Sequence, residues 1–108
     1  MSKPFVSFIV MSYKAEKFIQ EAIDGALAQT YDNLEIIFSD DASPDKTFEI
    51  IEENVKNYTG KHKDKISIYR NEKNLGIGAH LNKLWWEIAK GDWIVVSAGD
   101  DVSLPNRV

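Results

Sequence analysis

The chain has 108 residues, of which 44% are hydrophobic and 28% charged, and it carries a formal net charge of −4 at pH 7. This size and composition predict one small globular domain, or a part of a larger one, with a hydrophobic core of its own. The mildly acidic balance argues against a broad basic surface for nucleic acid. The absence of cysteine excludes disulfides, thiolate metal sites and a cysteine nucleophile.

No apolar run in the sequence approaches the roughly 18 residues of a membrane span. The few residues that precede the first apolar run are too short for a signal peptide. We therefore expect no membrane span in this stretch and a cytoplasmic location.

The N-terminal part of the sequence predicts two buried strands with a helix between them. The first strand covers residues 5–11, F-V-S-F-I-V-M, and the second covers residues 34–38, L-E-I-I-F. Both are apolar and contain β-branched side chains, as is typical of strands buried on both faces. Between them, apolar residues recur at helical spacing over about residues 15–29.

A second helix is predicted to begin at Ser43, with the serine as N-cap, Pro44 as the first helical residue and Asp45 in the first turn. Its apolar residues continue at helical spacing to Tyr58. The lysine-rich loop that follows contains His62, which we expect at the surface.

A third strand at residues 66–69, a third helix at residues 77–90 and a fourth strand at residues 93–97 complete an alternating order of strands and helices. The predicted fold class is therefore α/β, a Rossmann-like, mostly parallel sheet with helices on both faces. Because crossover connections are right-handed, we expect the strand order 3-2-1-4, with a topological switch between the first and fourth strands.

Two of the predicted strands end in adjacent carboxylates, at Asp40–Asp41 and Asp100–Asp101. Ligands of open α/β sheets bind at this rim, where Ser12 and Tyr13 should also lie. Two unit charges 4 Å apart repel by about 1 kcal/mol in water and about 4 kcal/mol at an effective dielectric constant of 20. Mg²⁺ or Mn²⁺ would relieve this repulsion and bridge the carboxylates to a diphosphate. The alternative is that each pair only forms a turn and a helix cap.

Other ligand-binding signals in the sequence are weak or missing. No G-x-G-x-x-G follows the first strand and no P-loop motif occurs, which argues against a dinucleotide cofactor and a P-loop nucleotidase. Tyr13 could stack on a nucleobase or be an ordinary half-buried tyrosine. His80, in the first turn of the third predicted helix, is a weaker candidate for a ligand contact.

The sequence contains a series of short motifs in a fixed order: V-S-F-I-V-M-S-Y (6–13), L-A-Q-T-Y-D-N-L-E-I-I (27–37), D-D-A-S-P-D-K-T (40–47), N-L-G (74–76), Asn82, A-K-G-D-W-I (89–94) and A-G-D-D (98–101). Together they resemble the opening of the family-2 glycosyltransferases, and the resemblance covers nearly the whole chain. It implies the GT-A fold, of which this stretch would be the nucleotide-sugar-binding half. It also implies transfer of a sugar from a nucleoside diphosphate donor to an acceptor, with Mg²⁺ or Mn²⁺.

Carried over to this sequence, the resemblance assigns nucleotide-sugar binding to Ser12, Tyr13, Asp41 and Asp100. Tyr13 would lie against the base, and Asp41 would accept a hydrogen bond from it, with uracil as the base in enzymes that use a UDP-sugar. Asp100 would contact the ribose or share the metal, and Asp101 would be the firmest metal ligand.

The sequence departs from the family pattern at two positions. Ala98 replaces the first aspartate of the frequent D-x-D-D motif, which shifts the metal site onto Asp100 and Asp101. Leu81 stands where many members carry an arginine near the diphosphate.

The family's general base lies well downstream, in the acceptor-binding half, whereas this sequence stops at Val108. We therefore interpret residues 1–108 as a donor-binding part that is truncated before the acceptor-binding half and inactive by itself. The parent is expected to be an inverting transferase that uses a UDP-sugar and a glycan acceptor in polysaccharide biosynthesis. It would lie in the cytoplasm or be held peripherally at the inner face of the membrane through the missing part.

Two alternatives stay open at this point. A phospho-receiver module also gathers aspartates and Mg²⁺ at a parallel-sheet rim, but its pattern would place acids after the first and third strands. Here those strands end in Met-Ser-Tyr and Tyr-Arg. The other alternative is a nucleotide-sugar-binding module with no chemistry of its own.

Overall fold

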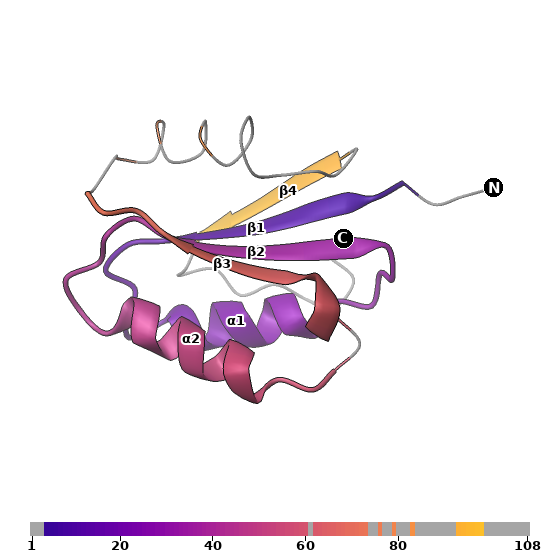
Figure 1. The fold of residues 1–108 in the computed structure, drawn as a ribbon, viewed down its shortest axis with the longest axis horizontal. Coiled ribbons are helices and arrows are strands. Elements are labelled where there is room, and N and C mark those ends of the chain that lie inside the picture. The colour runs from indigo at the N-terminus through magenta and orange to yellow at the C-terminus, as the bar shows by residue number, and fades with distance from the viewer. Residues whose placement is uncertain are drawn as a thin grey trace.

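The computed structural model describes residues 4–60, 62–73 and 93–98, together with Gly76, Ala79 and Lys83. In this part of the chain, four parallel strands form one sheet in the order β3-β2-β1-β4, which confirms the predicted order and fold class (Figure 1). The strands are β1 (Val6–Ser12), β2 (Leu34–Asp40), β3 (Ile66–Arg70) and β4 (Trp93–Ala98).

The strand register brings the carboxyl ends of all four strands to one rim of the sheet. Ser12 at the end of β1 pairs with Asp40, and Asp40 pairs with Arg70 at the end of β3. On the other side of β1, Met11 pairs with Ala98 of β4. Strand β2 is longer than the sequence predicted, so Asp40 is its last residue and does not belong to the following loop.

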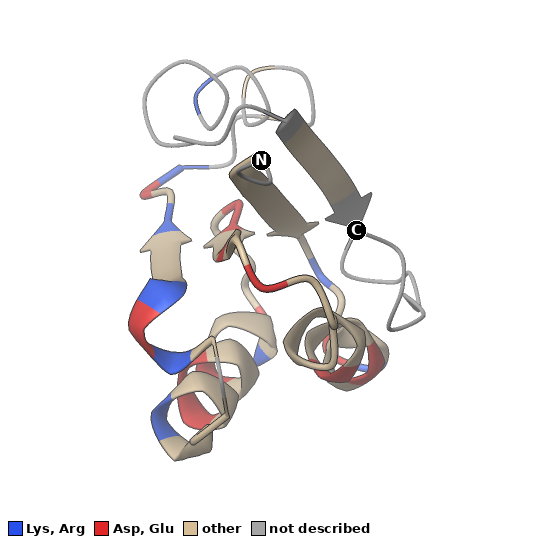
Figure 2. Cartoon of the chain, turned by 90° about the vertical axis from the view of Figure 1, so that its right-hand side faces the viewer, with Lys and Arg blue, Asp and Glu red and all other residues tan. Residues whose placement is uncertain are grey.

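Two α-helices, α1 (Ile19–Leu27) and α2 (Thr47–Asn57), lie side by side on one face of the sheet (Figures 1 and 2). Both belong to right-handed crossovers that step in the same direction, from β1 to β2 and from β2 to β3, so they cover the same face. A short 3₁₀ helix, η1 (Lys63–Lys65), precedes β3. The helix predicted at residues 77–90 falls almost entirely outside the described residues.

The core follows from the alternation of side chains along the two central strands. One set of residues faces α1 and α2, and includes Phe8 and Phe38, which are fully buried. The residues between them face the opposite side, where Ile9 and Ile37 are also fully buried and pack with Met11 and Ile94. Burial on both faces explains the continuous apolar runs in the sequence.

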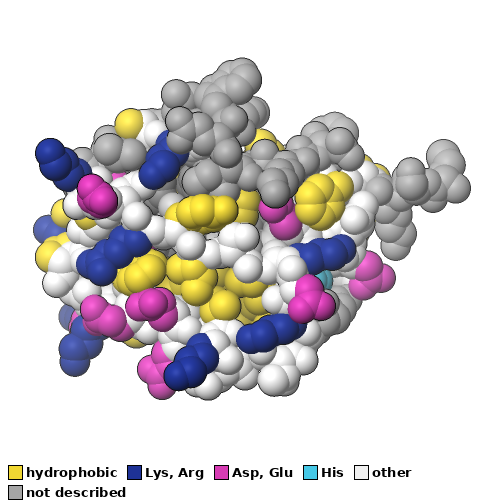
Figure 3. All heavy atoms as spheres, viewed as in Figure 1, with side chains coloured by type: hydrophobic (Ala, Val, Ile, Leu, Met, Phe, Trp, Pro, Cys, Tyr) yellow, Lys and Arg dark blue, Asp and Glu magenta, His cyan; other side chains and the backbone are white. Residues whose placement is uncertain are grey.

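No helix among the described residues is long and apolar enough to cross a bilayer. On the face shown in Figure 3, acidic and basic side chains are interspersed around apolar side chains.

The predicted start of the second helix at Ser43 is wrong, because α2 begins at Thr47. The side chain of Ser43 is buried and bonds to Asp40, so it does not cap the helix. Asp45, which precedes the N-cap residue Lys46, binds the first residue of the helix instead: its carboxylate accepts hydrogen bonds from the Thr47 amide, at 3.0 Å, and from the Thr47 hydroxyl, at 2.5 Å. Helix α1 also begins later than predicted, at Ile19.

The prediction that His62 lies at the surface is also wrong, since its side chain is only 1% exposed. Its Nε2 lies 2.8 Å from the carbonyl oxygen of Gln29, just beyond α1, and its backbone amide donates to the Tyr58 hydroxyl. The imidazole therefore ties the connection between α2 and β3 to the end of α1. The charged neighbours of His62 gave no sign of this burial.

The hydrogen bonds that the Asp45 carboxylate accepts should make a pH-dependent contribution to the free energy of unfolding. Partial burial by itself would raise the pKa of Asp45, but the hydrogen bonds from Thr47 and the Glu16 amide outweigh it and hold the pKa below its ordinary value of 3.8. The stabilisation is therefore present above that value and is lost as the pH falls through the lower, folded-state pKa. Asp45→Ala should lower the free energy of unfolding by about 1 kcal/mol near neutral pH and by less in acid. Urea unfolding at several pH values measures this, and a constant difference from native protein would contradict it.

His62→Ala should lower the free energy of unfolding by about 2–3 kcal/mol, because it removes a buried ring and a hydrogen bond to the Gln29 carbonyl. The matched control is Asp64→Ala in the same loop, whose exposed side chain should change stability by less than about 0.5 kcal/mol. Urea unfolding of both variants compares them. Equal effects would mean that the His62 ring does not contribute as its burial implies.

Candidate functional site

The rim of the sheet carries three pairs of residues at the ends of adjacent strands: Ser12–Tyr13, Asp40–Asp41 and Arg70–Asn71. Backbone hydrogen bonds continue beyond the strands and hold these pairs together. The Asp41 amide donates to the Ser12 carbonyl at 2.8 Å, and the Asn71 amide donates to the Asp40 carbonyl at 2.9 Å. The predicted site residues Ser12, Tyr13 and Asp41 are thus neighbours at one edge.

Asp40 forms the buried centre of this rim. Its side chain is 0% exposed, and its carboxylate accepts hydrogen bonds from the Ser12 hydroxyl (3.1 Å), the Ser43 hydroxyl (2.6 Å) and the Ser43 amide (2.8 Å). The Arg70 Nε lies 4.0 Å from the same carboxylate. The expectation that both carboxylates of this pair are available to a metal ion or ligand at the rim is therefore wrong for Asp40. Its charge is stabilised inside the protein by three hydrogen-bond donors and a cation.

Ser12 takes part in this buried centre and not in an open surface. Its side chain is almost fully buried, and its hydroxyl points to Asp40. In the described structure, Ser12 therefore stabilises the buried Asp40 carboxylate. The prediction that Ser12 contacts a nucleotide sugar stays untested.

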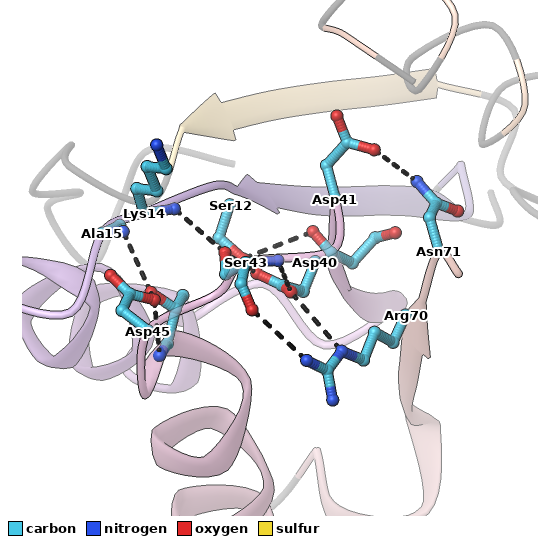
Figure 4. A network of polar contacts seen from close by, with 11 residues as sticks. Ser12, Lys14, Ala15, Asp40, Asp41, Ser43, Asp45, Arg70 and Asn71 are labelled. Carbon is cyan, nitrogen blue, oxygen red and sulfur yellow. Dashed lines mark hydrogen bonds and ion pairs between the residues drawn. The ribbon is translucent and has the colours of Figure 1, made fainter. Parts of the chain in front are cut away.

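Asp41 points to the other side of the rim from Asp40, as consecutive residues at a strand end do (Figure 4). It is 4% exposed, and each carboxylate oxygen accepts a hydrogen bond: Oδ1 from the Asn71 side-chain amide and Oδ2 from the Gly76 backbone amide, both at 2.9 Å. The side-chain amide oxygen of Asn71, Oδ1, in turn accepts a hydrogen bond from Lys83 Nζ at 2.9 Å. The segment after β3 thereby fixes the plane of the Asp41 carboxylate.

Tyr13 presents an aromatic ring at the same rim, with 43% of the residue exposed. Lys14 Nζ lies 5.3 Å from the centre of the ring. The loop that carries Tyr13 is held to the start of α2 and to the segment before it. The Lys14 amide donates to the Ser43 hydroxyl oxygen and the Ala15 amide donates to the Thr47 hydroxyl oxygen, both at 2.9 Å. These bonds hold the backbone on the C-terminal side of Tyr13 in place.

A hollow of about 480 Å³ lies at the rim beside the acidic pair. Ala42, at its edge, has φ of 59°, a left-handed conformation that turns the chain sharply after Asp41. Arg70 stacks over the Phe48 ring at 5.0 Å and donates to the Ser43 carbonyl at 3.3 Å. The hollow is lined by Ala42, Ser43, Pro44, Arg70, Asn71 and Glu72.

The predicted metal ligands Asp100 and Asp101 lie outside the described residues, as do His80 and Leu81. Strand β4 nevertheless ends at the same rim as β1 and β2, because Ala98 pairs with Met11. Within the part of the chain that the structure describes, no group of three or more acidic or histidine side chains is arranged to hold a metal ion.

The contributions of Arg70, Asn71, Gly76 and Lys83 are not predicted by the sequence, because no local pattern indicates the hydrogen-bond partners of these residues. The signal that could have found them is a glycine close to asparagines in a loop that follows a strand end. Gly76 has φ of 81°, which other residues rarely adopt, so the glycine is needed for its amide to reach Asp41.

The comparisons with known proteins agree with this architecture. A family model described as glycosyl transferase family 2 matches residues 7–108. EpsE of Bacillus subtilis (strain 168), a predicted glycosyltransferase, is 38% identical over 107 residues, which are 99% of this chain and 37% of that protein. The uncharacterized glycosyltransferase MJ1057 of Methanocaldococcus jannaschii is 38% identical over 110 residues, covering 100% of this chain and 36% of that protein. The chain thus spans little more than a third of the length of these relatives.

Solved structures give the same answer. The mannosyltransferase PcManGT from Pyrobaculum calidifontis, in complex with GDP-Man and Mn²⁺, matches with a TM-score of 0.81 and 26% identity over 94% of this chain and 29% of its own. TarS of S. aureus, residues 1–349 in complex with UDP-GlcNAc, matches with a TM-score of 0.71 and 25% identity over 94% of this chain and 28% of its own. Since the family model covers nearly the whole sequence, the chain belongs to glycosyltransferase family 2.

Proposed function

We propose that this chain is the donor-binding part of a metal-dependent glycosyltransferase that transfers a sugar from a nucleoside diphosphate, with UDP favoured, to a glycan acceptor. The observation that carries the proposal is the pairing of an exposed ring and a fixed carboxylate, Tyr13 and Asp41, at the rim where α/β sheets bind ligands. Two relatives of known structure support it, because one was solved with GDP-Man and Mn²⁺ and the other with UDP-GlcNAc.

In this proposal, the Asp41 carboxylate accepts a hydrogen bond from a ring N–H of the base, and Tyr13 stacks on the base. A carboxylate has about four lone-pair sites, so its contacts with Asn71 and Gly76 are compatible with a further donor. Uracil and guanine carry a ring N–H on their pairing edge, whereas cytosine and adenine present an acceptor nitrogen there. The acceptor-only carboxylate therefore favours the first two bases.

The metal would be Mg²⁺ or Mn²⁺, held by Asp101 and Asp100. Their hard carboxylate oxygens are suited to either ion. Both aspartates follow β4 in the sequence, and β4 ends beside β1 at the same rim as Asp41. A metal site after β4 would therefore suit the diphosphate of a nucleotide whose base binds at Asp41. When bound, the ion would neutralise the charge of the diphosphate leaving group.

The acceptor's proton would be taken by a base outside this chain, in a parent that we propose to be inverting and to act in cytoplasmic polysaccharide biosynthesis. Of the described rim carboxylates, Asp40 and Asp45 already have structural roles, in the buried centre and just before α2. Asp41 is assigned to the base, and Glu72 is an exposed side chain at the edge of the hollow. The chain by itself would then bind donor without transferring its sugar, because ground-state binding alone does not lower the chemical barrier.

Asp41→Asn should weaken uridine binding by about 1–3 kcal/mol, because an amide replaces the charged acceptor. The matched control, Asp40→Asn, should lower stability by about 1–3 kcal/mol through the buried network while changing uridine affinity much less. Calorimetric titration with uridine, guanosine and cytidine, together with urea unfolding, measures both effects. Identical uridine affinities for the two variants would show that the wrong aspartate has been assigned to the base.

Asp101→Asn should abolish the dependence of UDP binding on Mn²⁺ and leave the unfolding temperature unchanged. For native protein, we expect weaker UDP binding in EDTA than in Mn²⁺, whereas uridine, which has no phosphates, should bind equally in both. Glu72→Gln, an exposed acid at the same rim, is the control. Equal UDP affinity of native protein in EDTA and Mn²⁺ would rule out a bridging metal.

A further inference from the structure

Lys83, Asn71 and Asp41 form a chain of three polar side chains behind the proposed base site. The Lys83 ammonium donates to Asn71 Oδ1 at 2.9 Å, and Asn71 Nδ2 donates to Asp41 Oδ1 at 2.9 Å. Asn71 is only 5% exposed and Asp41 4%, so the contact between amide and carboxylate is shielded from water. Hydrogen bonds in such surroundings are stronger than at the surface and polarise one another.

The chemistry of the two ends permits only one orientation of the amide between them. An ammonium group has donors only, and an ionised carboxylate has acceptors only. A reversed Asn71 amide would place its oxygen against the Asp41 carboxylate and its NH₂ group against the Lys83 ammonium. The Asn71 amide therefore has one orientation, with Oδ1 toward the Lys83 ammonium and Nδ2 toward the Asp41 carboxylate.

We propose that Lys83 is a positioning residue for base recognition: by polarising Asn71, it fixes the plane of the Asp41 carboxylate that receives the base. The inference rests on the proposed function of Asp41 and adds a residue that contacts neither base nor metal. Its physical reason is directional. A hydrogen bond from a ring N–H weakens steeply away from linearity, so a carboxylate that can rotate receives the base less well.

The contact at the other carboxylate oxygen supports this role. Gly76 donates to Oδ2 from a backbone amide, while Asn71 donates to Oδ1. Donors on both carboxylate oxygens hold the plane more firmly than a donor on one oxygen, about which the group could still rotate. Asn71 is in turn held by a charged side chain, that of Lys83.

Lys83→Met is the decisive variant, because it keeps an unbranched chain of four heavy atoms and removes only the ammonium group at its end. Uridine should bind about tenfold more weakly, which matches the lower range of a hydrogen bond to a charged group. Lys83→Arg should restore most of the affinity, since a guanidinium can also donate to Asn71. Lys73→Met removes the same charge from an exposed position nearby and should leave the affinity unchanged.

A double-variant cycle separates positioning from a general effect of charge. In the Asp41→Asn background, Lys83→Met should have almost no further effect on uridine affinity, because the group that it positions is gone. Additive losses would overturn the proposal. If Lys83→Met does not fold, Lys83→Gln keeps a neutral donor and should bind with intermediate affinity; native affinity for Lys83→Gln would also contradict the proposal.

A spectroscopic readout without ligand distinguishes failure of this inference from failure of the proposed function. In a nitrogen–proton correlation spectrum, the side-chain amide protons of Asn71 should shift in Lys83→Met and stay in place in Lys73→Met. Unshifted Asn71 protons in Lys83→Met would overturn the inference, whatever the uridine affinity. If native protein binds no uridine but the protons shift, the contact exists and the proposed function fails, and the positioning role fails with it.

Discussion

The structure depends most on the buried charge of Asp40. Placing an ionised carboxylate inside a protein costs several kcal/mol unless hydrogen-bond donors replace its water. Ser12 and Ser43 supply three such donors, and Arg70 adds a cation nearby. Because these residues come from β1, β3 and the segment before α2, satisfying one charge fixes three separate parts of the rim relative to each other.

This arrangement separates the roles of two adjacent aspartates. Asp40 points to the side of the sheet that α1 and α2 cover, and Asp41 points to the opposite side, because side chains alternate along a strand. Asp40 therefore finds its hydrogen-bond donors inside the protein, in Ser12 and Ser43. Asp41 is held by Asn71 and Gly76 and is assigned here to the ligand. A pair of identical residues thus divides into a structural and a proposed binding position through backbone geometry alone.

The same geometry explains why the predicted helix start at Ser43 failed. A serine, a proline and an aspartate in succession are typical of a helix N-terminus. The Ser43 hydroxyl instead donates to Asp40, and it accepts the Lys14 amide, so it is unavailable as a cap. The first helical residue is Thr47, three residues later than predicted, and its amide donates to the Asp45 carboxylate. The preference of Ser43 for a helix N-cap was thus overridden, because its hydroxyl donates a hydrogen bond to the buried Asp40 carboxylate.

The class of fold, the strand order and the rim at which Tyr13, Asp41 and the strand ends gather can be predicted from the sequence. These follow from apolar periodicity, alternating elements and right-handed crossovers, which are local or nearly local properties. By contrast, the burial of Asp40 and His62 and the support of Asp41 by Asn71 and Lys83 become visible only in the folded chain. Burial and hydrogen-bond partners of polar residues depend on groups distant in sequence, and a charged side chain has the same local pattern whether water or another side chain solvates it.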